Sequence, residues 1–135
     1  MIEPEKLLYS KTHEWVHVES RSRGGKIATV GLSAFAIEAL TDLVYIDLPQ
    51  AGRQVTAGES LGEIESVKAV SDIYSPVDGE IVEVNTAIGG NLEQLAKDPY
   101  QAGWLVKIRI TDESGLKELL DHAAYQKECD RDNDE

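Results

Sequence analysis

GEIESVKAVSDIYSP, residues 62–76, places a single lysine, Lys68, between two strand-like runs. The apolar residues on either side of it favour β-strands: Ile64, Val67, Val70 and Ile73. Their pattern is interrupted around Lys68, which predicts a tight reversal with the amine at its tip. An ammonium group is strongly hydrated and costly to bury, so a lysine at such a tip projects into water on a flexible stem. The amine is then within reach of another enzyme's active site.

Exposure alone does not give this lysine a function. Lysine is among the residues found most often on protein surfaces, so without further context Lys68 is most simply an ordinary solvated turn residue. The rest of the chain must decide between this interpretation and an attachment point.

Short strands with turn signals between them continue in both directions from the lysine. The predicted strands are residues 15–18, 27–30, 43–48, 60–65, 70–74, 80–84 and 104–110. Turn signals lie at residues 49–52 and 57–58, at Pro76 and at Asp78-Gly79. Many short strands with regular turns predict a mainly β protein, a flattened β-sandwich or barrel of antiparallel strands.

A few short helices complete the predicted fold. Ser33 caps a helix over residues 34–40, and Asn91 caps another, with Gln94 reaching back as in a capping box. A terminal helix starts at Ser114, with one apolar face that packs on the sheet: Leu116, Leu119, Leu120, Ala123 and Ala124.

The length of the chain, 135 residues, fits one domain. We expect that domain to span residues 1–128. Residues 129–135 form a polar run that buries little, so we expect a frayed C-terminal tail there.

The charge of the chain is strongly negative. Thirteen Lys and Arg stand against 25 Asp and Glu, a formal net charge of −12. Such a charge repels phosphate backbones and anionic lipids, so nucleic-acid and membrane roles are not expected. It suits short-lived docking onto partners with basic patches. An acidic surface that only aids solubility is an equally good interpretation.

Cysteine usage and the amino end bear on the compartment. Cys129 is the only cysteine, so no intramolecular disulfide can form, which is typical of a reducing compartment. Residues 1–8 have neither an apolar secretory core nor an arginine-rich transit pattern, and no run reaches membrane-spanning length. The sequence therefore predicts a cytoplasmic, bacterial-type protein, with the mature form of an organellar protein as the alternative.

The sequence HEWVH, residues 13–17, matches the zinc-protease pattern HExxH. That pattern binds zinc on a helix, where positions four apart share one face. Here Trp15, Val16 and Val18 favour a strand, which would separate the two imidazoles by roughly 13 Å. We therefore expect no metal site. No phosphate loop or nucleophile elbow is present either, so we expect no catalytic residues.

Several motifs, in order along the chain, closely resemble the H-protein family of the glycine cleavage system, over about residues 8–125. The motifs are YSKTHEWV (9–16), LVYIDLP (43–49), GEIESVKA (62–69), SDIYSP (71–76), GEIVEVN (79–85), DPY (98–100) and GWL (103–105). The resemblance implies a lipoyl-domain-like fold and a carrier without catalysis of its own.

The resemblance also implies a cofactor and partners. Lipoate is attached to Lys68 as N6-lipoyllysine by a lipoate-attaching enzyme. A pyridoxal-phosphate enzyme, the P-protein, decarboxylates glycine and passes the aminomethyl group to the lipoyl disulfide. The T-protein transfers the one-carbon unit to tetrahydrofolate, and the L-protein, dihydrolipoyl dehydrogenase, reoxidises the dithiol. The carrier itself is expected to be monomeric.

Four further residues gain roles from the same resemblance. Lipoate-attaching enzymes recognise Glu65 and Gly79, although Gly79 belongs to an Asp-Gly pair, which is also an ordinary turn signal. Glu14 and Asp72 match the acidic contacts of the cleft that shelters the loaded arm, where a cationic amine needs a charge-assisted partner. The alternative is that both are ordinary surface acids.

Other carriers fit less well. A lipoyl domain of a 2-oxoacid dehydrogenase has Asp-Lys-Ala at its tip and Ala- and Pro-rich linkers, which are absent here. A biotin carrier has methionines beside its lysine, where this chain has Val67 and Ala69. An H-like protein that mainly relays lipoate to other lipoyl enzymes remains an alternative.

Overall fold

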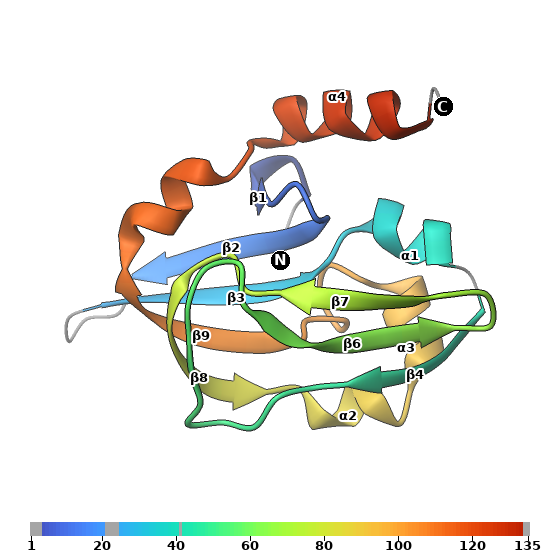
Figure 1. Ribbon diagram of the computed structural model, residues 1–135, viewed down its shortest axis with the longest axis horizontal. Helices are drawn as coiled ribbons and strands as arrows, with labels where there is room; N and C mark the ends of the chain where they lie inside the picture. The colour runs from blue at the N-terminus through green and yellow to red at the C-terminus, as the bar shows by residue number, and fades with distance from the viewer. Residues whose placement is uncertain (1–3, 21–24, 41, 134–135) are drawn as a thin grey trace.

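The strands form two antiparallel sheets (Figure 1) in the computed structural model, which describes residues 4–20, 25–40 and 42–133. The larger sheet has the order β1-β2-β3-β9-β8-β5 and the smaller β4-β6-β7. The larger sheet consists of β1 (Leu8–Tyr9), β2 (Glu14–Ser20), β3 (Lys26–Leu32), β5 (Gln54–Val55), β8 (Asp78–Val84) and β9 (Val106–Asp112). The smaller consists of β4 (Leu43–Asp47), β6 (Ser60–Ser66) and β7 (Val70–Tyr74). The mainly β, flattened sandwich predicted from the sequence is confirmed.

Alternating burial explains why the sheets pack face to face. In the smaller sheet Ile46 pairs with Ile64 across the strands, and both are buried. In the larger sheet Val30 pairs with Val106, also buried. These apolar faces belong to one continuous core cluster. The opposite face of the smaller sheet is left to solvent.

Two of the short helices begin where their caps were predicted. Helix α1 (Ala34–Leu40) starts after Ser33, whose Oγ accepts a hydrogen bond from the Ala36 amide at 3.2 Å. Helix α3 (Leu92–Lys97) starts after Asn91, whose side chain accepts from the Gln94 amide. The reciprocal bond of a capping box is absent at Asn91, because its own amide donates to the Ile88 carbonyl at 3.0 Å. Ile88 lies in helix α2 (Thr86–Gly89), which the sequence reading missed.

The single terminal helix predicted from Ser114 is wrong. A 3-10 helix, η2 (Glu113–Glu118), is followed by an extended segment and then by α4 (His122–Asn133). The interruption has a tertiary cause: Leu120 and Tyr9 exchange two backbone hydrogen bonds of 2.7 Å, so the chain is extended there.

The C-terminal tail also differs from expectation. Helix α4 continues through Asn133, past the boundary predicted at residue 128, and Cys129 is buried. It packs in a second apolar cluster with Leu7, Tyr9, Trp15 and Tyr125. The predicted tail therefore begins too early, and residues 134–135 lie outside the described residues.

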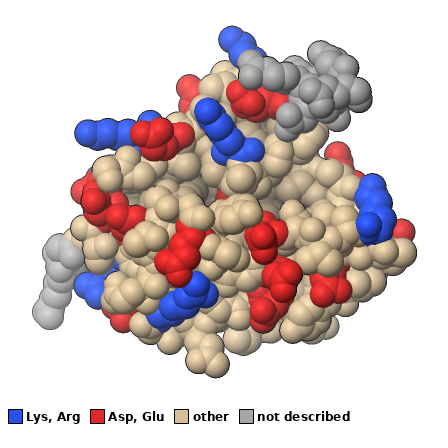
Figure 2. Space-filling model, in the orientation of Figure 1, with Lys and Arg blue, Asp and Glu red and all other residues tan. Residues whose placement is uncertain are grey.

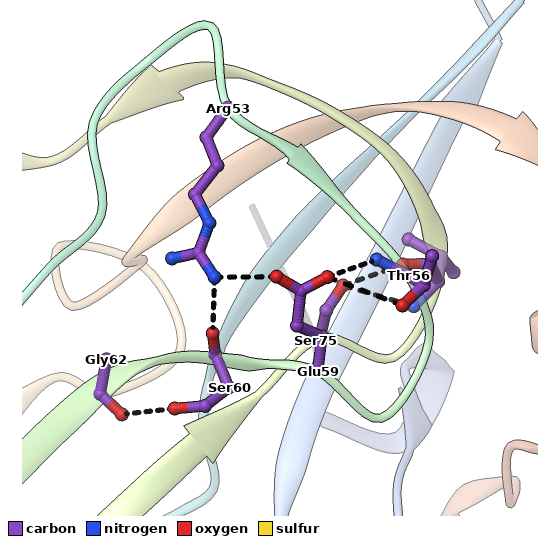
Figure 3. A network of polar contacts seen from close by, with 7 residues as sticks. Arg53, Thr56, Glu59, Ser60, Gly62 and Ser75 are labelled. Carbon is purple, nitrogen blue, oxygen red and sulfur yellow. Dashed lines mark hydrogen bonds and ion pairs between the residues drawn. The ribbon is translucent and has the colours of Figure 1, made fainter.

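A polar network fixes the start of β6, at the opposite end of the strand from Lys68 (Figure 3). The Arg53 guanidinium donates to Glu59 Oε2 at 2.7 Å and to the Ser60 carbonyl at 2.9 Å. Glu59 Oε1 accepts from the Thr56 amide at 3.1 Å, and the Ser75 amide donates to the Glu59 carbonyl at 2.8 Å. The Arg53 hydrogen bond lowers the pKa of the Glu59 carboxyl. The hairpin that carries the lysine is thus anchored at its base.

None of the helices in the described part of the chain is both long enough and apolar enough to cross a membrane.

Candidate functional site

The hairpin of β6 and β7 places Lys68 in the reversal between the strands, as predicted. Ser66 closes this reversal twice, because its amide donates to the Ala69 carbonyl at 2.8 Å and its Oγ accepts from the Ala69 amide at 3.1 Å. The Val67 amide donates to the carbonyl of Asp42 at 3.1 Å, which ties the tip to the segment before β4. The backbone under the lysine is therefore held in place.

The Lys68 side chain is exposed. Among the described residues, none makes a hydrogen bond or an ion pair with it. A fixed backbone that displays a solvated, unpaired amine is what an attachment point needs, because the modifying enzyme need not break any contact to reach the amine.

Glu65 and Gly79, the two residues expected to guide attachment, lie on different sheets. Glu65 is half-buried on β6, opposite Tyr45 of β4 and Val70 of β7. It lies three residues before the lysine and next to the tip. Gly79 lies on β8 in the other sheet. The structure therefore does not bring the two together as one local feature.

Gly79 does not form the turn that its Asp-Gly sequence suggested. Strand β8 begins at Asp78, so both residues are extended, and Gly79 is opposite Val55 on one side and Ile110 on the other. A Cβ at this position would lie 2.2 Å from the carbonyl oxygen of Arg109. The close approach of β9 therefore requires glycine at position 79, whether or not the lipoate-attaching enzyme also recognises this residue.

Replacing Gly79 by alanine should destabilise the fold, because the added methyl group cannot fit against the β9 backbone. We expect a loss on the order of 1–3 kcal/mol in the free energy of unfolding, measured by urea denaturation. Gly89→Ala is the matched control, since a Cβ at Gly89 meets no atom within 4 Å. A Gly79→Ala protein as stable as the wild type would contradict the packing requirement. Any lost lipoate attachment in this variant must be judged against its stability.

Glu14 is fully buried at the start of β2, so the interpretation as an ordinary surface acid is wrong for this residue. Its Oε1 accepts hydrogen bonds from the hydroxyls of Ser10, at 2.6 Å, and Thr12. Its Oε2 accepts from the Tyr74 amide at 3.3 Å. Burial raises the pKa of the Glu14 carboxyl, and the hydrogen bonds from Ser10, Thr12 and Tyr74 oppose that shift.

The Glu14 carboxylate has donors but no counter-ion. Among the described residues, no lysine, arginine or histidine forms an ion pair with it. It lines a cavity of about 540 Å³ together with Lys11, Tyr74 and Glu118. Lys11 also lines this cavity but forms no ion pair with Glu14, so the buried carboxylate is still able to bind a cationic ligand.

Asp72 lies close by on the exposed side of β7. Its carboxylate accepts a hydrogen bond from the Tyr74 hydroxyl at 3.3 Å. It lines a second, smaller cleft of about 160 Å³ against α1. Glu14 and Asp72 thus share the neighbour Tyr74, and Thr12 borders both cavities. The structure brings the two acids into one neighbourhood but not into one cavity.

His13 forms one wall of the smaller cleft and has a left-handed backbone, with a φ of 75°. Such a conformation is uncommon outside glycine and is held by its surroundings. The Ser33 amide donates to the His13 carbonyl at 2.9 Å, and His13 Nδ1 lies 2.7 Å from the Tyr125 hydroxyl. The same hydroxyl lies 2.5 Å from Ser33 Oγ. Tyr125 of α4 therefore joins His13, which lines the cleft, to Ser33, the capping residue of α1.

Sequence reasoning missed Ser66 and Tyr125. A serine two residues before a tip lysine is a weak local signal for a closed turn. Tyr125 gave no signal, because 112 residues separate it from His13.

The HExxH pattern does not form a helical pair of ligands. As predicted, its residues enter a strand, β2. His13 faces Tyr125, whereas His17 Nε2 lies 3.6 Å from Glu19 further along the strand. In the part of the chain that the structure describes, no group of three potential ligands is placed to hold a metal ion.

Comparisons with known proteins show the family of the chain. A family model described as Glycine cleavage H-protein matches residues 7–132. A Glycine cleavage system H protein of Rhodopirellula baltica is 52% identical over 128 residues, 94% of this chain and 95% of the relative. One of Thermotoga maritima is 50% identical over 121 residues, 90% of this chain and 94% of the relative.

A solved structure agrees as well. The crystal structure of a glycine cleavage system H protein from Mycobacterium marinum superposes with a TM-score of 0.82 at 41% identity, covering 93% of this chain and 97% of that one. The chain therefore belongs to the glycine cleavage H-protein family, the non-catalytic lipoyl carriers of the glycine cleavage system.

Proposed function

We propose that Lys68 is the residue that carries the lipoyl group, as N6-lipoyllysine. The observation that carries this proposal is the fixed hairpin tip with an exposed amine that forms no hydrogen bond or ion pair with a described residue. The bound group would supply a disulfide whose S–S bond breaks as one sulfur bonds to the aminomethyl carbon of decarboxylated glycine, and the dithiol left after transfer would be reoxidised by the L-protein. On this proposal the chain visits a P-protein, a T-protein and an L-protein in turn.

The chain itself contributes an exposed attachment point for the arm at a fixed place. Amide formation removes the lysine charge, so the arm is no longer held in water by an ammonium group. A flexible tether raises the effective concentration of its cargo at each partner without requiring tight binding. The hydrogen bonds of Ser66 and Val67 keep the base of this tether at a fixed place.

We further propose that Glu14 and Asp72 receive the protonated amine of the loaded arm. The support is the buried Glu14 carboxylate, which forms no ion pair with a described residue and lines a cavity. A charge-assisted hydrogen bond to the arm would provide that missing partner. Asp72, which lines the neighbouring smaller cleft, would add negative charge near the arm. Recognition of Glu65 and Gly79 by the lipoate-attaching enzyme is part of the same proposal.

A monomeric, cytoplasmic protein that folds as one domain, which continues past residue 128 through α4, completes the proposal. The cytoplasmic compartment is supported by Cys129, a buried residue that is the only cysteine of the chain, so no intramolecular disulfide can form. Light scattering of the purified protein should give the mass of one chain.

The decisive experiment for attachment is intact mass spectrometry after expression with lipoate and an attaching enzyme. The mass should rise by one lipoyl group, and peptide mapping should place it on Lys68. An unmodified Lys68 under conditions that modify a known carrier would overturn the proposal.

Glycine cleavage is tested by adding the lipoylated protein to P-protein with glycine and labelled bicarbonate. Exchange of the label into glycine is expected. If a known carrier supports exchange and this protein does not, the alternative function, a lipoate relay, would be favoured instead.

A further inference from the structure

The outer face of the small sheet is uncovered. In Figure 1 the strands β4, β6 and β7 face the viewer, and no helix lies in front of them. Strand register assigns the residues of this face. Tyr45, Glu65 and Val70 form one cross-strand row, and Asp47, Glu63 and Asp72 form the next row on the same face. The opposite face, with Ile46 and Ile64, belongs to the core.

Exposed apolar side chains gather at the lysine end of the small sheet. Five large apolar residues are exposed among the described residues, and four of them lie on β4 or the hairpin: Val44 (53% exposed), Tyr45 (54%), Val67 (75%) and Val70 (58%). The fifth, Val82, lies on β8 in the other sheet. Scattered exposed apolar residues need no explanation, but a group around one position marks a contact surface. We call Val44, Tyr45, Val67 and Val70 the tip patch.

Carboxylates border the tip patch. Asp47 and Glu63 are exposed and directly opposite each other, and Glu63 is also opposite Asp72. Like charges directly across strands destabilise a sheet. Among the described residues, no lysine or arginine forms an ion pair with Asp47, Glu63 or Glu65. Figure 2 shows acidic side chains across this view of the molecule.

We propose that the tip patch and the Asp47–Glu63 pair dock the lipoate-attaching enzyme, through an apolar area bordered by lysine or arginine side chains. The apolar patch provides the contact area, and the uncompensated carboxylates determine that the partner's border is basic. This proposal rests on the function proposed above and names a partner surface for the same site.

The position of the tip patch selects the attaching enzyme among the possible partners. That enzyme must take the Lys68 ε-amine itself into its active site, so its surface must meet the side chains that flank the lysine. The other partners act at the far end of an extended arm, and a long tether lets them work without touching the patch.

Two variants test the surface. Asp47→Asn/Glu63→Gln removes the charge pair, and Tyr45→Thr/Val70→Thr removes apolar area with residues that favour strands. In steady-state assays of lipoate attachment, each should raise the KM for this protein about tenfold with kcat unchanged, which corresponds to about 1.4 kcal/mol. The salt dependence of KM should also become weaker in the charge variant. The charge variant should not be less stable, because it relieves repulsion.

Val82→Ala/Glu83→Gln is the matched control, since both residues are exposed on the other sheet. It should have the wild-type KM. If the wild type itself is not lipoylated, the proposed function fails. If the wild type is lipoylated and both test variants keep its KM, only the docking surface fails. If the variants are lipoylated normally but the lipoylated variants then support less exchange of label into glycine, the face docks P-protein instead. That result would overturn the proposal.

Discussion

Lys68→Arg should abolish lipoyl attachment and with it all carrier activity, while the fold stays unchanged. The guanidinium of arginine remains protonated at physiological pH and cannot take the place of the amine that forms the amide. Lys68 is exposed, and its side chain forms no hydrogen bond or ion pair with a described residue that a substitution could break. Intact mass should show no lipoyl addition, and label exchange between bicarbonate and glycine should fall to background.

Lys97→Arg provides the matched control for this loss. Lys97 is an exposed lysine on α3 whose Nζ lies 3.6 Å from Glu93, a weak surface pair. Its variant should be lipoylated and active at wild-type levels. Both variants should have the thermal midpoint of the wild type. A Lys68→Arg protein that still gains one lipoyl group would show that another lysine carries the arm.

The hairpin that carries Lys68 could be predicted because its signals are local. Strand-favouring residues on either side and an interrupted pattern define a reversal within a few residues. The same holds for α1, which begins after a serine cap at the predicted residue. By contrast, β1 and β5 have only two residues each, too few for a periodic pattern, and the sequence reading missed both.

Long-range contacts explain the errors. The apolar spacing after Ser114 fits one helix, but backbone hydrogen bonds between Leu120 and Tyr9 break it. Asp78-Gly79 is a turn signal, yet β9 packs so closely that the glycine is needed inside a strand. In both cases a partner distant in the sequence overrides a sound local preference.

The residues of the candidate site also divide into those that the local sequence predicts and those that depend on distant contacts. Lys68 and Glu65 belong to a motif that is continuous in sequence. The burial of Glu14 could not be read from its neighbours, because it depends on β7, which brings the Tyr74 amide to its carboxylate. The link from Tyr125 to His13 depends on where α4 packs, which nothing near either residue specifies.

Glu14→Gln should shorten the lifetime of the aminomethyl-loaded arm. On the proposed function the amine of the arm pairs with the buried Glu14 carboxylate, and a hydrogen bond to a charged group contributes about 1.5–3 kcal/mol. Loss of the charge should therefore speed the loss of the aminomethyl group about tenfold or more. Intact mass of the loaded protein, followed over time, measures this rate. Glu38→Gln, at an exposed position of α1, is the control and should not change it.

The pH dependence of stability gives Glu14 a second, independent test. Burial raises its pKa above the ordinary value of 4.5, so the folded state holds this proton more tightly than the unfolded state. The contribution of Glu14 to stability is fully present below pH 4.5 and is lost as pH rises through the raised pKa. Glutamine cannot ionise and does not incur this loss. The difference in unfolding free energy between Glu14→Gln and wild type should therefore move in favour of the variant as pH rises.

Urea denaturation of both proteins between about pH 4 and pH 8 measures this difference across the range in which the raised pKa acts. The two tests separate the roles of the residue, because the stability test needs no arm and the lifetime test needs it loaded. A difference in stability that does not change with pH would show that Glu14 is not held in a desolvated site. A normal lifetime of the loaded arm in Glu14→Gln, together with the expected pH effect, would leave the carboxylate buried but assign the amine another partner. Asp72, exposed at the neighbouring cleft, would then be the acid to substitute.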